Sequence, residues 1–134
     1  MSWLQTGLIV IGKPAAEHVS INITDRNSEG WLSGTLEVSA GAWSGRCGAW
    51  FYKGELCQFA AEIEKLYGDL IRPAQFTPME PCLELKLTGR QGHILVEGKA
   101  QDRFLDGNYV AFRLVLGQTE LPVIANALRM ADQN

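Results

Sequence analysis

The chain has 134 residues, of which 46% are apolar and 20% charged, and its net charge is −3. These values are ordinary for one folded domain and exclude the low-hydrophobicity, high-charge composition of disordered chains. The mild acidity and the lack of a basic cluster disfavour nucleic acid as a partner, because such binding needs a basic patch that displaces counterions. We expect a single domain over residues 1–134.

Two features of the chain bear on its compartment. The longest apolar run near the start, residues 8–11, is too short for a membrane span of ~20 residues or for a signal-peptide core. The three cysteines, Cys47, Cys57 and Cys82, are far apart and odd in number, which argues against a disulfide framework and fits a reducing environment. We therefore expect a cytoplasmic protein without membrane contact, whose thiols are buried and inert.

The first part of the chain shows strand patterns. Residues 7–11 form an apolar run that ends at Gly12 and Pro14, which is typical of a short buried strand followed by a turn. Residues 19–24 and 32–39 alternate apolar and polar side chains, the period-two pattern of strands with one dry face and one wet face.

Residues 43–52 predict a long aromatic strand interrupted by glycines. Trp43 and Phe51 share one face of this strand, and we expect both to pack in the core. Trp50 and Tyr52 share the other face, where core packing and partner binding both stay open, since aromatic side chains are enriched at interface hot spots.

A helix is predicted over residues 55–67, because its apolar side chains recur at the i, i+3, i+4, i+7 spacing of a surface helix. Gly68 is expected to form the left-handed cap at its end. This segment is also the most acidic part of the chain, with a net charge of −3 over residues 55–69. The charged residues there are Glu55, Glu62, Glu64, Lys65 and Asp69.

The second half returns to strands. Residues 72–81 hold three prolines and are expected to run irregularly, with at most a short extended piece at 75–77. Residues 83–88 and 94–98 alternate around a glycine-flanked turn, which predicts a hairpin. A further strand at 109–116 and an amphipathic helix at 119–131 follow. We expect an α+β domain, mostly antiparallel sheet of about seven strands, sandwich-like or strongly bent, with one mid-chain and one C-terminal helix.

Reactive chemistry is not evident in this pattern. His18 and His93 lack other good ligands at metal-binding spacing. The Gly-x-Ser-x-Gly elbow and a phosphate-binding glycine loop are absent. The acids Asp102 and Asp106 faintly resemble a calcium loop but lack its full ligand series. We expect no catalytic residue, no cofactor and no metal, and hence a protein that is not an enzyme.

The acidic helix face is the candidate binding surface. We expect Glu55, Glu62 and Asp69 to steer a basic protein partner, with Trp50 and Tyr52 as aromatic anchors. The alternative is a solvated outer face with no partner, which is the more common role of such charges.

Five segments of the chain, taken in order, resemble the WapI-type immunity family and related small domains of unassigned function. The resemblance covers about residues 17–131 and implies a non-enzymatic cytoplasmic protein that binds and neutralises a cognate toxin. Where the family pattern has Asp-Gln-Thr before the last helix, this chain has Gly117-Gln118-Thr119. The segments are Gly41-Ala-Trp-Ser-Gly45, Gly54-Glu-Leu-Cys-Gln-Phe59, Leu83-Glu-Leu-Lys-Leu87, Gly92-His-Ile-Leu-Val-Glu-Gly98 and Gln118-Thr-Glu-Leu121.

Two other classes stay open at this stage. A small-molecule carrier on a closed antiparallel barrel would explain the many strands, the terminal helix and the Gly41-Ala-Trp43 triplet. A hydrolase or nuclease would require His18 or His93 to meet an acid in a cleft. A large apolar cavity favours the carrier, and a dry core favours protein binding.

Overall fold

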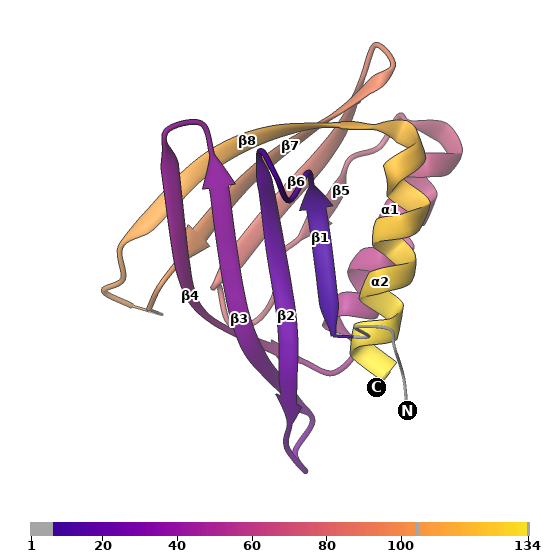
Figure 1. The fold of residues 1–134 in the computed structure, drawn as a ribbon. Helices are drawn as coiled ribbons and strands as arrows, with labels where there is room; N and C mark the ends of the chain where they lie inside the picture. Colours follow the sequence, from indigo (N-terminus) through magenta and orange to yellow (C-terminus); the bar gives the residue numbers. More distant parts are fainter. Residues whose placement is uncertain (1–6, 104, 134) are drawn as a thin grey trace.

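The computed structural model describes residues 7–103 and 105–133. These residues form eight strands and two long helices, so the predicted α+β class with a mid-chain and a C-terminal helix is confirmed (Figure 1). The elements are β1 (Leu8–Gly12), β2 (His18–Arg26), β3 (Trp31–Ala40), β4 (Trp43–Tyr52), α1 (Glu55–Asp69), β5 (Ala74–Phe76), β6 (Leu83–Arg90), β7 (His93–Gln101), β8 (Tyr109–Gly117), a 3₁₀ turn (Gln118–Glu120) and α2 (Leu121–Gln133).

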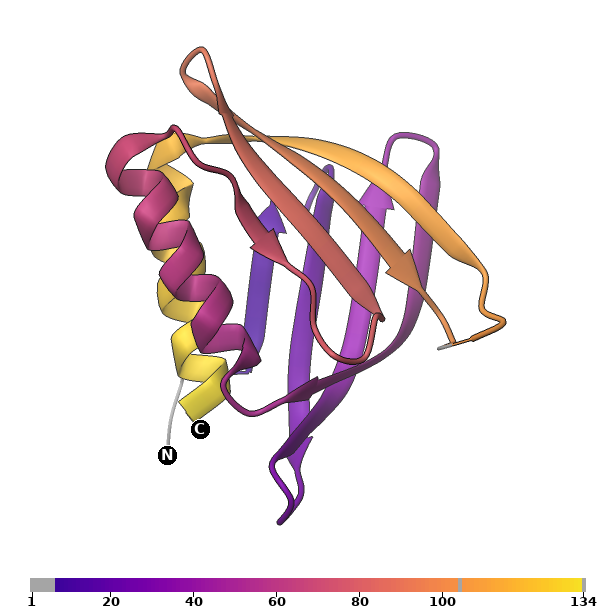
Figure 2. The ribbon, with the colours of Figure 1, turned by 180° about the vertical axis from the view of Figure 1, so that it is seen from behind.

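The strands form two four-stranded antiparallel sheets, β1-β2-β3-β4 and β5-β6-β7-β8. The sheets face each other, and the two helices pack together along one side of the pair (Figure 2). On that side α2 lies against β1 and α1 lies against β5. On the opposite side, between β4 and β8, residues 7–103 and 105–133 form no helix.

The core lies between the sheets and the helix pair. The alternation in the strands has its expected effect, since Val19, Ile21 and Ile23 are buried while Asn22 and Thr24 are exposed. Aromatic packing connects α1 with β5, because the rings of Phe59 and Phe76 stack with 4.8 Å between their centroids. The helical side chains that face the core are Leu56, Phe59, Ala60, Ile63, Leu66, Leu121, Ile124, Ala125, Leu128 and Ala131.

Several element boundaries differ from the sequence prediction; the C-terminal helix, for example, begins at Leu121 after a 3₁₀ turn and not at residue 119. The extended piece among the prolines is a true strand, because Ala74–Phe76 pairs with Leu85–Leu87 at the edge of the second sheet. The cap prediction for Gly68 is wrong: α1 continues through this residue, and Leu70 adopts the left-handed conformation at φ 60°. The carboxylate of Asp69 accepts the Ile71 N–H at 3.0 Å, which stabilises the chain as it leaves the helix.

Candidate functional site

The acidic face of α1 is only partly assembled into one surface. Glu55 and Glu62 line a shallow polar hollow of about 360 Å³ together with Gln75 and Thr77 of the β5 segment. Asp69 lies seven residues beyond Glu62, ~10 Å along the helix axis. The structure therefore brings two of the three proposed acids together and leaves the third at the far end of the helix.

Glu55 has a structural task that the sequence did not reveal. Its carboxylate accepts the backbone N–H of Tyr52 at 2.6 Å and that of Met79 at 2.7 Å. These bonds tie the start of α1 to the end of β4 and to the proline-rich segment. Glu62 and Asp69 thus carry the part of the acidic face that is freer to meet a partner.

The fourth acid of the helix is paired. Arg129 of α2 donates to both carboxylate oxygens of Glu64, at 2.6 and 3.0 Å. This hydrogen-bonded guanidinium lowers the pKa of Glu64 below its ordinary value. The charge of Glu64 is therefore balanced across the helix pair, and the unbalanced acids of α1 are those predicted to bind a partner.

Asp132, which the sequence pattern does not indicate as a site residue, caps the start of α1. Gly54 precedes the helix with φ 93° and has no side chain to satisfy the first amides. The buried carboxylate of Asp132 does so instead, accepting the N–H of Gly54 at 2.8 Å and that of Cys57 at 2.8 Å. Arg26 in turn donates to the backbone oxygens of Ala131 and Asp132. The end of α2 is thereby joined to the start of α1 and to β2.

The aromatic side chains of β4 divide between two faces. Trp50 and Tyr52, for which core packing and partner binding were both open, point away from the core; Trp50 is 48% exposed, and Tyr52 is half-buried beside Trp31, with 5.3 Å between ring centroids. Phe51 is fully buried, which confirms its core assignment. The core assignment of Trp43 is wrong, because this side chain is 71% exposed at the open end of the strand.

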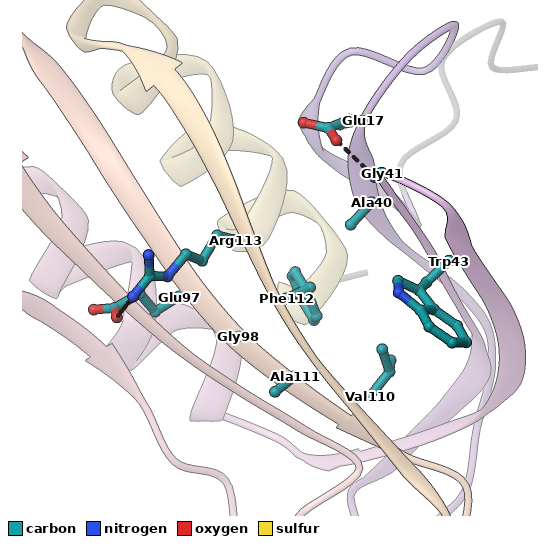
Figure 3. Close-up of a pocket in the computed structure, with 10 residues that line it drawn as sticks. All are labelled: Glu17, Ala40, Gly41, Trp43, Glu97, Gly98, Val110, Ala111, Phe112 and Arg113. Carbon is teal, nitrogen blue, oxygen red and sulfur yellow. Dashed lines mark hydrogen bonds and ion pairs between the residues drawn. The ribbon is translucent and has the colours of Figure 1, made fainter.

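Trp43 lines a hollow of about 510 Å³ between the two sheets (Figure 3). Its indole faces Val110 and Phe112 of β8 across the opening. On the rim the carboxylate of Glu17 accepts the Gly41 N–H at 2.6 Å. A second hollow of about 230 Å³ adjoins the first at Val110. Together they form a cleft along the side of the molecule opposite the α1–α2 pair.

The histidines do not lie at these hollows. His18 is buried, and its Nε2 lies 3.4 Å from Oε1 of Glu37 on the outward face of β2 and β3. His93 is exposed at the β6–β7 turn. Within residues 7–103 and 105–133, no three His, Cys, Asp or Glu side chains are grouped to hold a metal ion.

The three cysteines are free thiols of different accessibility. Cys82 is buried, as expected, and burial raises its pKa to about 11. Cys47 and Cys57 are only partly buried, so their predicted burial is incomplete. Desolvation raises the pKa of each of these two thiols as well.

Comparison with protein families places the chain. The model of the Immunity protein WapI-like family matches residues 10–131, which run from β1 almost to the end of α2. The chain belongs to this family. A search of curated proteins found no match for this WapI-like protein. Among the residues described in the structure, no helix has the length and apolar character needed to cross a bilayer.

Proposed function

We propose that this protein is a cytoplasmic immunity protein that binds a cognate toxin domain and neutralises it without catalysing a reaction. The observation that carries the proposal is the WapI-like family match, which spans both sheets and both helices. The free thiols fit the reducing compartment in which such a toxin would have to be inhibited.

The acidic face of α1 supports binding to a basic toxin surface. Glu62 and Asp69 project negative charge from one helix, with Glu55 between them and β4. Complementary charge raises the association rate of two proteins and favours the correct orientation. Trp50 and Tyr52 would add apolar contact area beside the start of this helix, where aromatic anchors contribute most.

The proposal is tested with the C-terminal domain of a large secreted protein encoded beside this gene. Coexpression should rescue growth, and the two purified domains should bind in calorimetry. Replacing Glu62 and Asp69 by lysine should slow association ~10-fold and flatten its dependence on salt. The matched control is Asp25→Lys with Glu29→Lys, the same charge change on the exposed β2–β3 segment.

Two results would contradict this proposal at different levels. Absence of both rescue and binding removes the immunity function itself. Binding whose association rate is equal in the α1 variant and in the control removes the acidic face as the steering surface and leaves the function in place.

A small-molecule carrier is the second candidate, and the 510 Å³ cavity is the observation that favours it. Its volume lies within the ~300–1,000 Å³ of ordinary ligand sites. The strands do not form the closed barrel expected for such a carrier, since they are divided into two sheets. Native mass spectrometry of the purified chain distinguishes the two functions, because a carrier would retain a ligand of defined mass.

A further inference from the structure

The cleft between the sheets is bordered by two strand edges. β4 is the last strand of the first sheet and β8 is the last strand of the second. Among the strands that the structure describes, β4 pairs only with β3 and β8 pairs only with β7. Such an edge presents backbone donors and acceptors to any extended chain that can reach it.

The register shows which groups of β4 face outward. Ala40 and Trp43 flank a two-residue turn, so their backbones bond to each other, and the direction then alternates along the strand. Ser44, Arg46 and Gly48 therefore turn their N–H and C=O groups away from β3. The next residue in this series agrees, because the outward carbonyl of Trp50 accepts the Cys82 thiol at 3.8 Å.

The same argument applies to β8. Arg90 and His93 flank the two-residue turn between β6 and β7, so odd residues of β7 bond to β6 and even residues bond to β8. On β8 the odd residues therefore point their backbone groups outward, as the N–H of Gly117 does when it donates to Glu120 at 2.8 Å. The outward set is Tyr109, Ala111, Arg113 and Val115, for which the described residues provide no backbone partner.

The cleft narrows at one end and opens at the other. Thiol hydrogen bonds hold the narrow end, from Cys47 to the Gln101 carbonyl at 3.9 Å and from Cys82 to the Trp50 carbonyl. At the open end Trp43 faces Phe112 (Figure 3). The inward position of Gly45 is empty there, since no atom lies within 4 Å of the place where a Cβ would be.

We propose that an extended segment of the cognate toxin occupies this cleft, pairs its backbone with the outward edge of β8, and places an apolar side chain between Trp43 and Phe112. The inference rests on the proposed immunity function and specifies its contact surface. In a strand alternate side chains point to opposite faces, so one such segment satisfies the polar edge and the apolar wall together.

A second copy of this chain fits the cleft less well. If two β8 strands paired edge to edge, the inward side chains of the partner strand, Phe112 and Leu114, would remain buried in their own core. The exposed Trp43 indole would then stay uncovered. The side chains of an extended toxin segment are not buried in a core of their own, so one of them can fill the cavity.

The surface lies on the side of the molecule opposite α1 (Figures 1 and 2). Val123 of α2 offers a control for Trp43, because it is also a strongly exposed apolar side chain but lies on the helix side of the molecule. With the C-terminal toxin domain as the probe, Trp43→Ala should raise Kd ~30-fold or more, the effect of an interface hot spot. Val123→Ala should change Kd less than ~5-fold.

Amide-resolved hydrogen exchange gives a readout that a loss of packing alone would not produce. Ala111 and Arg113, whose amides point outward, should exchange rapidly in the free chain and become protected on binding, whereas Phe112 should be protected in both states. No binding of the toxin domain to the wild-type chain would remove the proposed function together with this inference.

Other outcomes would overturn only the proposal that a toxin segment binds in the cleft. Tight binding with unchanged Kd for Trp43→Ala and no new protection on β8 would leave the immunity function standing and discard the segment. Protection of Ala111 and Arg113 that rises with concentration in the free chain would assign the edge to a second copy. A small molecule retained in native mass spectrometry and lost in Trp43→Ala would assign the cleft to a carrier.

Discussion

Replacing Asp132 should destabilise the fold through a helix 75 residues or more away in sequence. Its carboxylate is the acceptor for the N–H groups of Gly54 and Cys57 at the start of α1. Hydrogen bonds to charged groups contribute about 1.5–3 kcal/mol each, and loss of an N-cap costs ~0.5–2 kcal/mol. Since Gly54 and Cys57 are not fully buried, water can replace part of the loss. We expect Asp132→Ala to lower the free energy of unfolding by about 2 kcal/mol.

Urea unfolding followed by circular dichroism and tryptophan fluorescence measures this change. Asp132→Asn keeps one acceptor oxygen but loses the charge at the helix start, so it should cost about 1 kcal/mol. Asp106→Ala is the matched control, because it removes an exposed carboxylate with the same change in net charge and should stay within ~0.5 kcal/mol of wild type. If Asp132→Ala also stays within that margin, the cross-helix cap contributes nothing and the reasoning fails.

Three further predictions concern stability and reactivity. Because the pKa of Glu64 is lowered by Arg129, its stabilisation is present above the ordinary value of 4.5 and is lost as pH falls through the lower folded pKa. Glu64→Gln should therefore unfold at slightly lower urea than wild type at pH 7, and this difference should shrink as the pH is lowered below 4.5; a constant difference would refute the pairing. With a pKa of about 11, Cys82 is ~0.1% thiolate at pH 8 and should resist alkylation until the protein unfolds, which mass mapping can check. Gly34→Ala should cost about 1–3 kcal/mol, because its Cβ would meet the β2 backbone, whereas Gly45→Ala has open space and should cost nothing; equal unfolding midpoints would contradict this contrast.

The strands and helices could be predicted because each is a local pattern. Alternation at residues 19–24 and 32–39 fixes which side chains face inward, and the sheet then buries that set. The spacing in residues 55–67 likewise fixes the buried face of α1. The two-residue turn at Gln91 and Gly92, with φ of 45° and 87°, follows from the glycine at its second position. In each case the signal lies within one element.

The candidate sites were less predictable because they depend on how distant elements meet. The hydrogen bond from Gly54 to Asp132 spans 78 residues. The local sequence indicates only that the start of α1 lacks a capping side chain of its own, and it does not indicate which distant residue supplies the cap. The alternation in β4 correctly predicts that Trp43 lies on the same face as the buried Phe51. Burial also depends on whether the facing sheet extends over the side chain. The sheets diverge at that end, so the indole is exposed.

The two sides of the sheet pair differ in whether the edge strands are covered by helices. α1 and α2 fill the space between β1 and β5, so the polar edges of those two strands are covered, while β4 and β8 keep theirs. Exposed edges invite aggregation unless charge guards them. Arg46 on β4 and Arg113 on β8 are both exposed beside the cleft, and if two β8 strands paired antiparallel about Arg113, the like charges would meet directly, which is unfavourable. The same guanidinium groups would not oppose a segment that carries neutral or acidic side chains at those positions, which is therefore the charge pattern expected of the proposed toxin segment.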